Sequence, residues 1–177
     1  EGICHVYVHA DADPEKACNI ILNSKMRRTG VCGAAETLLI DKVIADDLLG
    51  RISVELLNAG CSLRGDDRAC ALLPNIAAAN EKDWRTEYLD SILSVRVVDD
   101  IDMAIAHIAK YGSSHTESIV TESHSAADQF FAEVDSAIVM HNTSTQFADG
   151  GEFGMGAEIG IATGRLHARR ACSLPVA

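Results

Sequence analysis

The chain has 177 residues, of which 47% are hydrophobic, and its formal net charge is −11. This length suits one domain of ordinary size, and the composition is that of a folded chain rather than a disordered one. The negative charge argues against nucleic-acid and anionic membrane surfaces, because both attract clustered lysine and arginine. No apolar stretch approaches the length that spans a bilayer. We therefore expect neither a nucleic acid nor a membrane as a partner.

Cysteine and histidine spacing favours reduced thiols over a disulfide framework or a metal site. The six cysteines are irregularly spaced, no secretory signal precedes them, and a chain of this length does not need cross-links to fold. No Cys-X-X-Cys pair occurs and the histidines are scattered singly, so we expect no metal. Reduced thiols predict a cytoplasmic location.

Strands and helices are expected to alternate along the chain. Alternating apolar residues indicate strands, and caps such as Asp13 before Pro14 indicate helix starts. Residues 61–85 carry no clear pattern. The predicted strands are Ile3–Val8, Thr37–Ile40, Ile92–Val98, Glu117–Thr121 and Ala137–Met140. The predicted helices run from about Pro14 to Met26 and over Val43–Ala59, Ile101–Lys110 and Ser125–Glu133. This order predicts an α/β fold of three layers, a mostly parallel sheet with flanking helices.

A long polar segment, rich in glycine and without periodicity, follows the last predicted strand over residues 141–158. In α/β sheets, a loop that leaves the carboxyl end of a strand often binds a ligand. The segment contains no Walker A or Gly-X-Gly-X-X-Gly phosphate loop. The alternative is a solvated connector, although structureless loops of this length are usually functional or disordered.

Cys32 is the strongest candidate nucleophile. It follows a basic cluster of Lys25, Arg27 and Arg28, which favours a thiolate. Its neighbours are small residues, and the apolar run 38–40 would fix the turn to a strand. A thiolate in an open turn is suited to attack on a carbonyl carbon. The alternative is a small buried hydrophobic side chain, which is the usual role of a free cysteine.

Other single residues are weaker candidates. Glu36 and Glu87 are the carboxylates nearest to informative sequence, and each is interpreted as a surface or cap residue rather than a general base. Trp84 is interpreted as an anchor in the core or in a loop.

Several blocks of sequence, spread in order from residue 1 to about residue 169, carry a family resemblance. They are Gly2–Val8, Gly30–Cys32, Ala34–Leu39, Thr86–Leu89, Glu133–Ser136, Asn142–Phe147, Asp149–Gly154 and Leu166–Arg169. Together they resemble γ-glutamyl phosphate reductase (glutamate-5-semialdehyde dehydrogenase) of proline biosynthesis, a family of the aldehyde dehydrogenase superfamily.

The resemblance implies an aldehyde dehydrogenase-like catalytic domain that uses NADPH to reduce L-glutamyl 5-phosphate to L-glutamate 5-semialdehyde and phosphate. It implies that Cys32 is the nucleophile and forms a thioester. Glu87 matches the Glu-X-Phe position that touches the nicotinamide ribose, although Leu89 replaces the phenylalanine. The implied substrate-binding residues are Asn142, Ser144, Thr145 and Phe153.

The resemblance also divides the chain. From the resemblance we expect residues 1–169 to be the catalytic domain without the dinucleotide-binding domain that precedes it in the family, and residues 170–177 to be a tail that does not follow the family. We therefore expect the chain alone to be inactive and the full-length protein to form a homo-oligomer. Two alternatives stay open: another aldehyde dehydrogenase that oxidises an aldehyde to the acid, and a non-catalytic binding module of the same fold.

Overall fold

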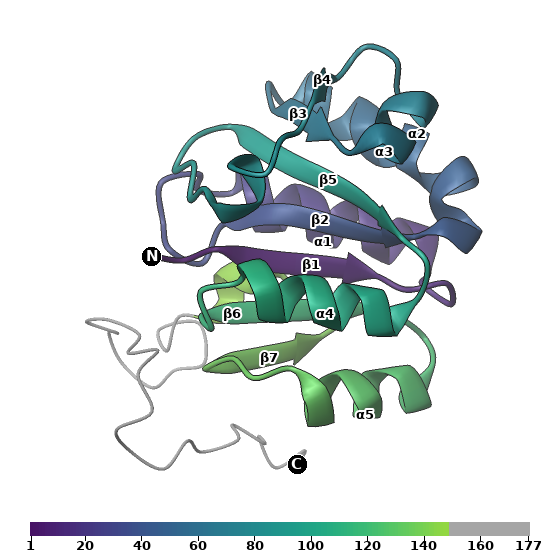
Figure 1. Ribbon diagram of the computed structural model, residues 1–177, viewed down its shortest axis with the longest axis vertical. Helices are drawn as coiled ribbons and strands as arrows, with labels where there is room; N and C mark the ends of the chain where they lie inside the picture. Colours follow the sequence, from purple (N-terminus) through teal and green to yellow (C-terminus); the bar gives the residue numbers. More distant parts are fainter. Residues whose placement is uncertain (149–177) are drawn as a thin grey trace.

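The computed structural model describes residues 1–148, in which seven strands form one sheet (Figure 1). The strands are β1 (Cys4–Val8), β2 (Ala35–Asp41), β3 (Ser62–Gly65), β4 (Ala77–Ala78), β5 (Ile92–Val98), β6 (Thr116–Val120) and β7 (Ile138–His141). Their order is β4-β3-β5-β2-β1-β6-β7. Every neighbouring pair runs parallel, which confirms the predicted α/β class.

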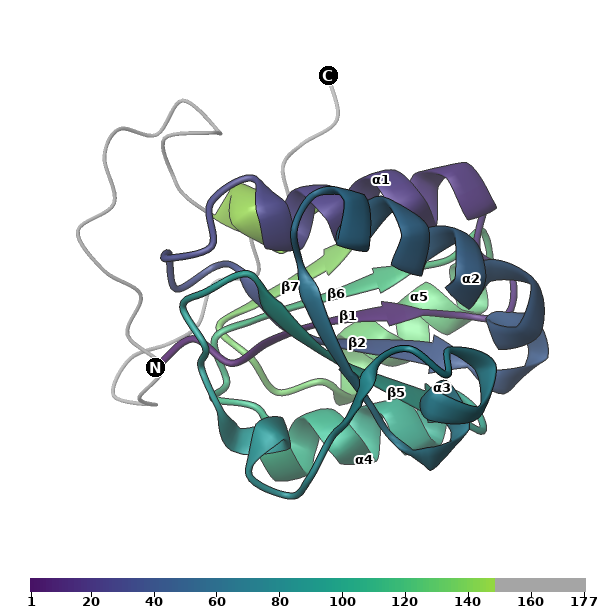
Figure 2. The same cartoon turned by 90° about the horizontal axis from the view of Figure 1, so that it is seen from above.

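Helices cover both faces of this sheet. They are α1 (Pro14–Met26), α2 (Lys42–Asn58), α3 (Asp67–Leu72), α4 (Ile101–Tyr111) and α5 (His124–Glu133), with 3-10 turns η1 (Asp83–Arg85) and η2 (Thr145–Ala148). Figure 2 shows α1 and α2 on one side of the sheet and α4 and α5 on the other, which gives three layers. Within residues 1–148, no helix combines the length and hydropathy needed to cross a bilayer.

Short polar side chains define where the helices begin. The Asp13 carboxylate accepts a hydrogen bond from the amide of Lys16, and Pro14 occupies the first turn of α1. Asp41, Asp100 and Ser123 cap α2, α4 and α5 in the same way. These oxygens satisfy backbone N–H groups that have no partner within the helix.

Two hydrophobic clusters lie on opposite faces of the sheet. Leu38 of β2 packs into the cluster under α1 and α2, whereas its neighbour Leu39 packs into the cluster under α4 and α5. Because successive side chains of a strand point to opposite faces, a central strand covered on both sides buries side chains on both of its faces. Every residue of β1 and β2 is buried.

The predicted elements agree with the structure to within one or two residues at each end. Residues 61–85, which carried no pattern, contain β3, α3, β4 and η1. All four are short, and a short element offers too few residues for a periodicity to emerge. Trp84, expected to be an anchor, is buried. The five cysteines within residues 1–148 are free thiols.

The segment after β7 leaves the carboxyl end of its strand. Residues 142–148 then return along the α1 face of the sheet. Asn142 donates its amide to Ile119 of β6, while Gln146 reaches the carbonyl of Arg28 beyond the end of α1. The segment therefore connects the carboxyl ends of the strands with the turn that precedes β2.

Candidate functional site

Cys32 lies exposed in the turn between α1 and β2, at the amino end of β2. Gly2, just before β1, packs directly on this turn: a Cβ atom at Gly2 would overlap the carbonyl oxygen of Cys32. The same carbonyl accepts a hydrogen bond from Cys4 Sγ at 3.2 Å. The backbone of Cys32 is therefore held against the start of the central strand, while its side chain is open to solvent.

Glu87 is brought to the same place from the loop after η1. Its Oε1 accepts a hydrogen bond from the amide of Gly2 at 2.8 Å. Gly2 thus contacts Cys32 and Glu87 at once, although 85 residues separate Gly2 from Glu87 in sequence. The resemblance implies that Cys32 is the nucleophile and Glu87 a cofactor contact, and both residues contact Gly2.

Cys4 is a structural thiol rather than a second nucleophile. Burial, with the Glu117 carboxylate nearby, holds the pKa of Cys4 well above its usual value. A thiol that keeps its proton is a hydrogen-bond donor, and its Sγ lies near both the carbonyl of Cys32 and Nδ1 of His115, 3.6 Å away.

The structure corrects the interpretation of the basic cluster. Lys25 is fully buried, and its Nζ lies 2.6 Å from Glu36 Oε2, so Lys25 does not join the exposed charges beside Cys32. Arg27 and Arg28 are exposed. The interpretation of Glu36 as a surface or cap residue is also wrong, because its side chain is 1% exposed.

Thr145, in the segment that follows β7, also lies against the Cys32 turn. A Cβ atom at Gly33 would lie 3.2 Å from the carbonyl oxygen of Thr145, so the two backbones are in close contact. Thr145 is completely buried, and its Oγ1 has no hydrogen-bond partner within residues 1–148. Of the predicted substrate residues described, Thr145 is the one placed directly against the turn.

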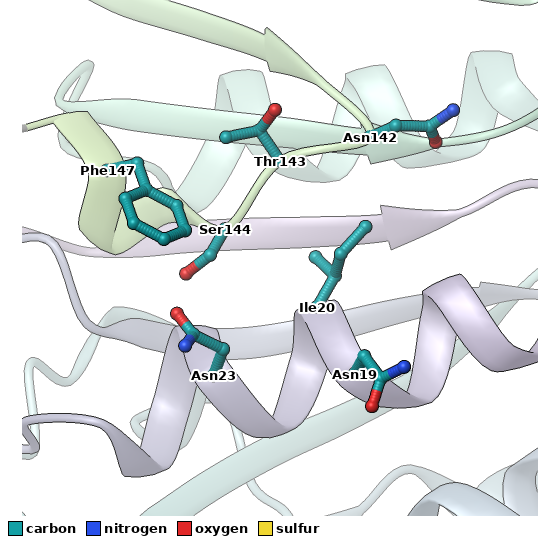
Figure 3. A pocket seen from close by; sticks show the side chains of 7 residues that line it. All are labelled: Asn19, Ile20, Asn23, Asn142, Thr143, Ser144 and Phe147. Carbon is teal, nitrogen blue, oxygen red and sulfur yellow. The ribbon is translucent and has the colours of Figure 1, made fainter. Parts of the chain in front are cut away.

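A pocket of about 340 Å³ opens between α1 and the returning segment (Figure 3). Asn23 and Ser144 point toward one another across it, from the two elements. Asn23 Oδ1 is buried without a hydrogen-bond partner among the described residues, whereas Ser144 Oγ accepts a hydrogen bond from the Ser24 hydroxyl at 3.2 Å. The lining carries amide, hydroxyl and apolar groups but no charge: Asn19, Ile20, Asn23, Asn142, Thr143, Ser144 and Phe147.

The remaining predicted substrate residues are placed differently. Asn142 has a φ of 51°. Its side-chain amide both accepts from the amide of Thr121 and donates to the carbonyl of Thr121, so it ties β7 to the end of β6. In Figure 3 Asn142 stands at the end of the lining farthest from Phe147. Phe153 lies outside the described residues.

Three structural contributors were missed at the level of sequence: Gly2, Cys4 and the Lys25–Glu36 pair. Gly2 belongs to a matching block, but its packing on Cys32 depends on the pairing of β1 with β2. Lys25 and Glu36 stand on either side of the turn, 11 residues apart, at a spacing typical of no local motif.

Comparison with known proteins gives a consistent result, although no family model matches the chain. A curated γ-glutamyl phosphate reductase from Hyphomonas neptunium is 64% identical over 169 residues, which is 96% of this chain. Relatives of the same name from Methylobacterium sp. and Rhodospirillum rubrum are 62% and 60% identical, each over 96% of this chain. The chain spans about 40% of the length of this relative.

Solved structures agree. The crystal structure of γ-glutamyl phosphate reductase from Thermotoga maritima superposes with a TM-score of 0.92 and 48% identity, over 95% of this chain and 41% of that chain. An acetylating aldehyde dehydrogenase from Geobacillus thermoglucosidasius matches at 18% identity with a TM-score of 0.64, over 89% of this chain and 43% of that chain. The second match concerns the fold alone, and it confirms the aldehyde dehydrogenase-like architecture.

Proposed function

We propose that this chain carries the thiol centre of a γ-glutamyl phosphate reductase, which reduces L-glutamyl 5-phosphate to L-glutamate 5-semialdehyde and phosphate. The observation that carries the proposal is the exposed Cys32 held beside Glu87 through Gly2, in a sequence 64% identical to a curated reductase. We assign residues 1–169 to the catalytic domain. The divergent tail, residues 170–177, lies outside the described residues. Homo-oligomerisation and a cytoplasmic location stay predictions.

The proposed chemistry begins at Cys32. Its sulfur, as the thiolate, adds to the acyl carbon of the acyl phosphate; the carbon–oxygen bond to phosphate then breaks, leaving a thioester and free phosphate. We assign the backbone N–H of Cys32 as a donor to the oxygen that becomes negative during the attack. Hydride added to the acyl carbon would leave a negative oxygen; as the carbon–oxygen double bond forms again, the carbon–sulfur bond breaks and Cys32 leaves as the thiolate, the form in which it attacked.

Glu87 suits a nicotinamide cofactor in one respect. Its Oε1 is engaged by the amide of Gly2, and a carboxylate has a second oxygen that can accept a hydrogen bond from a ribose hydroxyl. NADPH, when bound, would supply the hydride for the reduction. Glu87, half-buried and fixed through Gly2, would orient the ribose close to Cys32.

Thr145 and the neighbouring pocket are proposed to hold the glutamyl end of the substrate. Thr145 lies against Gly33, and Ser144 and Asn23 supply hydroxyl and amide groups. Asn142 contributes mainly by fixing the segment to β6. Phe153 remains proposed as a substrate contact.

The reductase is favoured over an aldehyde dehydrogenase that forms the free acid. Such an oxidation needs a base to activate water. Of the two carboxylates considered near Cys32, Glu36 is paired with Lys25 inside the protein, and Glu87 accepts the amide of Gly2 and is assigned to the cofactor. An acyl phosphate, in contrast, is already activated and needs chiefly a nucleophile and an oxyanion donor.

Acylation by acetyl phosphate tests the proposal on the chain itself. We expect the acetyl group on Cys32, detected by peptide mass spectrometry, and its loss in Cys32→Ser. Burial raises the pKa of Cys61 to about 11, which lowers its thiolate fraction at neutral pH roughly a hundredfold relative to an ordinary thiol. Cys61→Ser is therefore the matched control and should leave the acetylation unchanged.

Brief treatment with iodoacetamide should likewise label Cys32 before the other cysteines, because Cys32 is exposed while Cys4, Cys18 and Cys61 are buried. Labelling or acetylation of Cys61 or Cys70 with Cys32 unmodified would contradict the assignment.

A further inference from the structure

A buried ion pair, Lys25–Glu36, links the helix before the Cys32 turn to the strand after it. Lys25 is near the end of α1 and Glu36 is near the start of β2, so the pair joins the two elements between which the turn is suspended. Nζ and Oε2 are 2.6 Å apart, and the two side chains are 0% and 1% exposed. Removing two charges from water is expensive, and an apolar pair of similar volume often stabilises a fold as well. Stability alone therefore gives a weak reason for an ion pair at this position.

The second oxygen of the same carboxylate holds the Glu87 segment. Glu36 Oε1 accepts a hydrogen bond from the amide of Leu89 at 3.4 Å. Leu89 has a φ of 52°, in the left-handed region that a leucine rarely adopts, so its conformation needs support from its surroundings. Burial raises the pKa of Glu36, whereas Lys25 and the backbone amides of Leu89 and Tyr88 oppose that rise.

Tyr88 fixes the same segment from its other side. Its ring centroid lies 5.9 Å from Lys25 Nζ, and its hydroxyl contacts Asp83 Oδ1 at 2.8 Å and Ser94 Oγ at 2.9 Å. The two residues that follow Glu87, Tyr88 and Leu89, thus contact the ion pair or the sheet.

We propose that Lys25 and Glu36 are positioning residues, which set the place of Glu87 relative to Cys32. One oxygen of Glu36 anchors the turn that carries the thiol, through Lys25, and the other anchors the loop that carries Glu87, through Leu89. This inference rests on the proposed function, because Cys32 and Glu87 need a common frame only if they act on the same substrate and cofactor.

Two double variants separate the two oxygens. Lys25→Met/Glu36→Gln removes the ion pair but keeps a side-chain oxygen for the amide of Leu89. Lys25→Met/Glu36→Met removes both and has a side chain of similar length. Lys16→Met/Glu122→Met is the control for loss of charge, because it removes an exposed ion pair of 2.9 Å between α1 and the segment that joins β6 to α5.

Amide hydrogen exchange at Leu89, followed by NMR on the 177-residue chain, is the primary measurement. We expect Leu89 to exchange about twofold faster in the Met/Met variant than in the Met/Gln variant, the effect of losing a long hydrogen bond of 3.4 Å. The rate of Cys32 alkylation should change in both double variants and should stay unchanged in the Lys16/Glu122 control. A merely structural pair would alter the unfolding midpoint of both variants without distinguishing Leu89 between them.

Equal Leu89 exchange in two folded double variants would overturn the inference. If the Met/Met variant does not fold, native-state hydrogen exchange of the unmodified chain is the deciding measurement. The openings that expose the amides of Leu89 and Ala34 to exchange should then have the same free energy. Different opening free energies would show that the Glu87 loop and the Cys32 turn are not coupled. Failure of the proposed function is read separately, as the absence of Cys32 acetylation in the unmodified chain.

Discussion

His107 of α4 is a buried imidazole whose chemistry is set by its neighbours. Its Nδ1 lies 2.8 Å from Arg96 Nη1, and a guanidinium can only donate, so Nδ1 must accept and the ring is neutral. The rings of Trp84 and Tyr111 pack against it. Burial, with smaller contributions from His5, Arg96 and Lys110, lowers the pKa of His107 from an ordinary value of 6.5 to about 2.

This depressed pKa makes stability dependent on pH. The unfolded chain binds a proton at this position near pH 6.5, whereas the folded chain does not until about pH 2. The free energy of unfolding should therefore fall as the pH drops below 6.5, by about 2 kcal/mol at pH 5 from this group. His107→Gln, which keeps a neutral acceptor for Arg96, should lose that much less between pH 7 and pH 5 in urea unfolding.

The control for this comparison is His124→Gln, at the exposed start of α5. It removes an imidazole from the chain without touching the cluster around His107. If His107→Gln and the unmodified chain lost equal stability over this pH range, the buried imidazole would not be the cause.

At the scale of single residues, the sequence predicts which residue types surround a site better than it predicts where their side chains point. The small residues beside Cys32 correctly predicted an open turn, because size is a property of the residue alone. Lys25 was assigned to the same basic cluster as Arg27, yet its side chain enters the protein. Which way a side chain points at the end of a helix depends on the elements packed around it, and those come from distant parts of the chain.

At the scale of elements, α1 and the returning segment 142–148 depend on one another. Gln146 Nε2 donates to the carbonyls of Ser24 and Arg28, at 2.8 Å and 3.1 Å. Carbonyls at the end of a helix have no partner within the helix, so the glutamine supplies one from another element. Gln146→Met should reduce the free energy of unfolding by about 2 kcal/mol, because buried carbonyls lose their donor.

Urea unfolding measures this effect, with Gln129→Met as the matched control. Gln129 also donates a side-chain hydrogen bond, to Asp102 at 2.8 Å, but on the exposed surface of α5. Its loss should change the free energy of unfolding by less than about 0.5 kcal/mol. Equal effects of the two variants would show that Gln146 does not support the end of α1.

Long elements were predictable, and their arrangement was predictable only as a class. Helix caps and apolar runs located α1, α2 and α4 because those signals are local. The return of residues 142–148 was not predictable, since it depends on contacts with Ser24 and Arg28, 122 and 118 residues from Gln146. The family resemblance implied the role proposed for Cys32, but it did not reveal which groups hold Cys32 in place.

At the scale of the whole molecule, the charge opposes binding of a dinucleotide by this chain alone. NADPH is an anion, and the chain has a formal net charge of −11. The single ribose contact proposed, Glu87, contributes about 1 kcal/mol, against a larger cost of ordering the cofactor. Calorimetry with the 177-residue chain should give a dissociation constant for NADPH weaker than roughly 1 mM.

Micromolar affinity would contradict this expectation. The variant Glu87→Gln would then locate the binding site. If the heat of NADPH binding is lost in this variant, NADPH binds at Glu87; if the heat is unchanged, NADPH binds elsewhere. The expected inactivity of the isolated chain is read in the same samples from the absorbance of NADPH.

The central place of β1 in the sheet has a consequence for how the thiol centre is assembled. β1 pairs with β2 on one side and β6 on the other, and the amide of His5 is bonded to a carboxylate 112 residues away. Contacts of such high sequence separation require closure of long loops, which is the slow part of folding for parallel sheets. Gly2, which joins Cys32 to Glu87, leads directly into this strand. The surroundings of Cys32 therefore form only when segments more than a hundred residues apart have come together, although Cys32 itself stands in the first fifth of the chain.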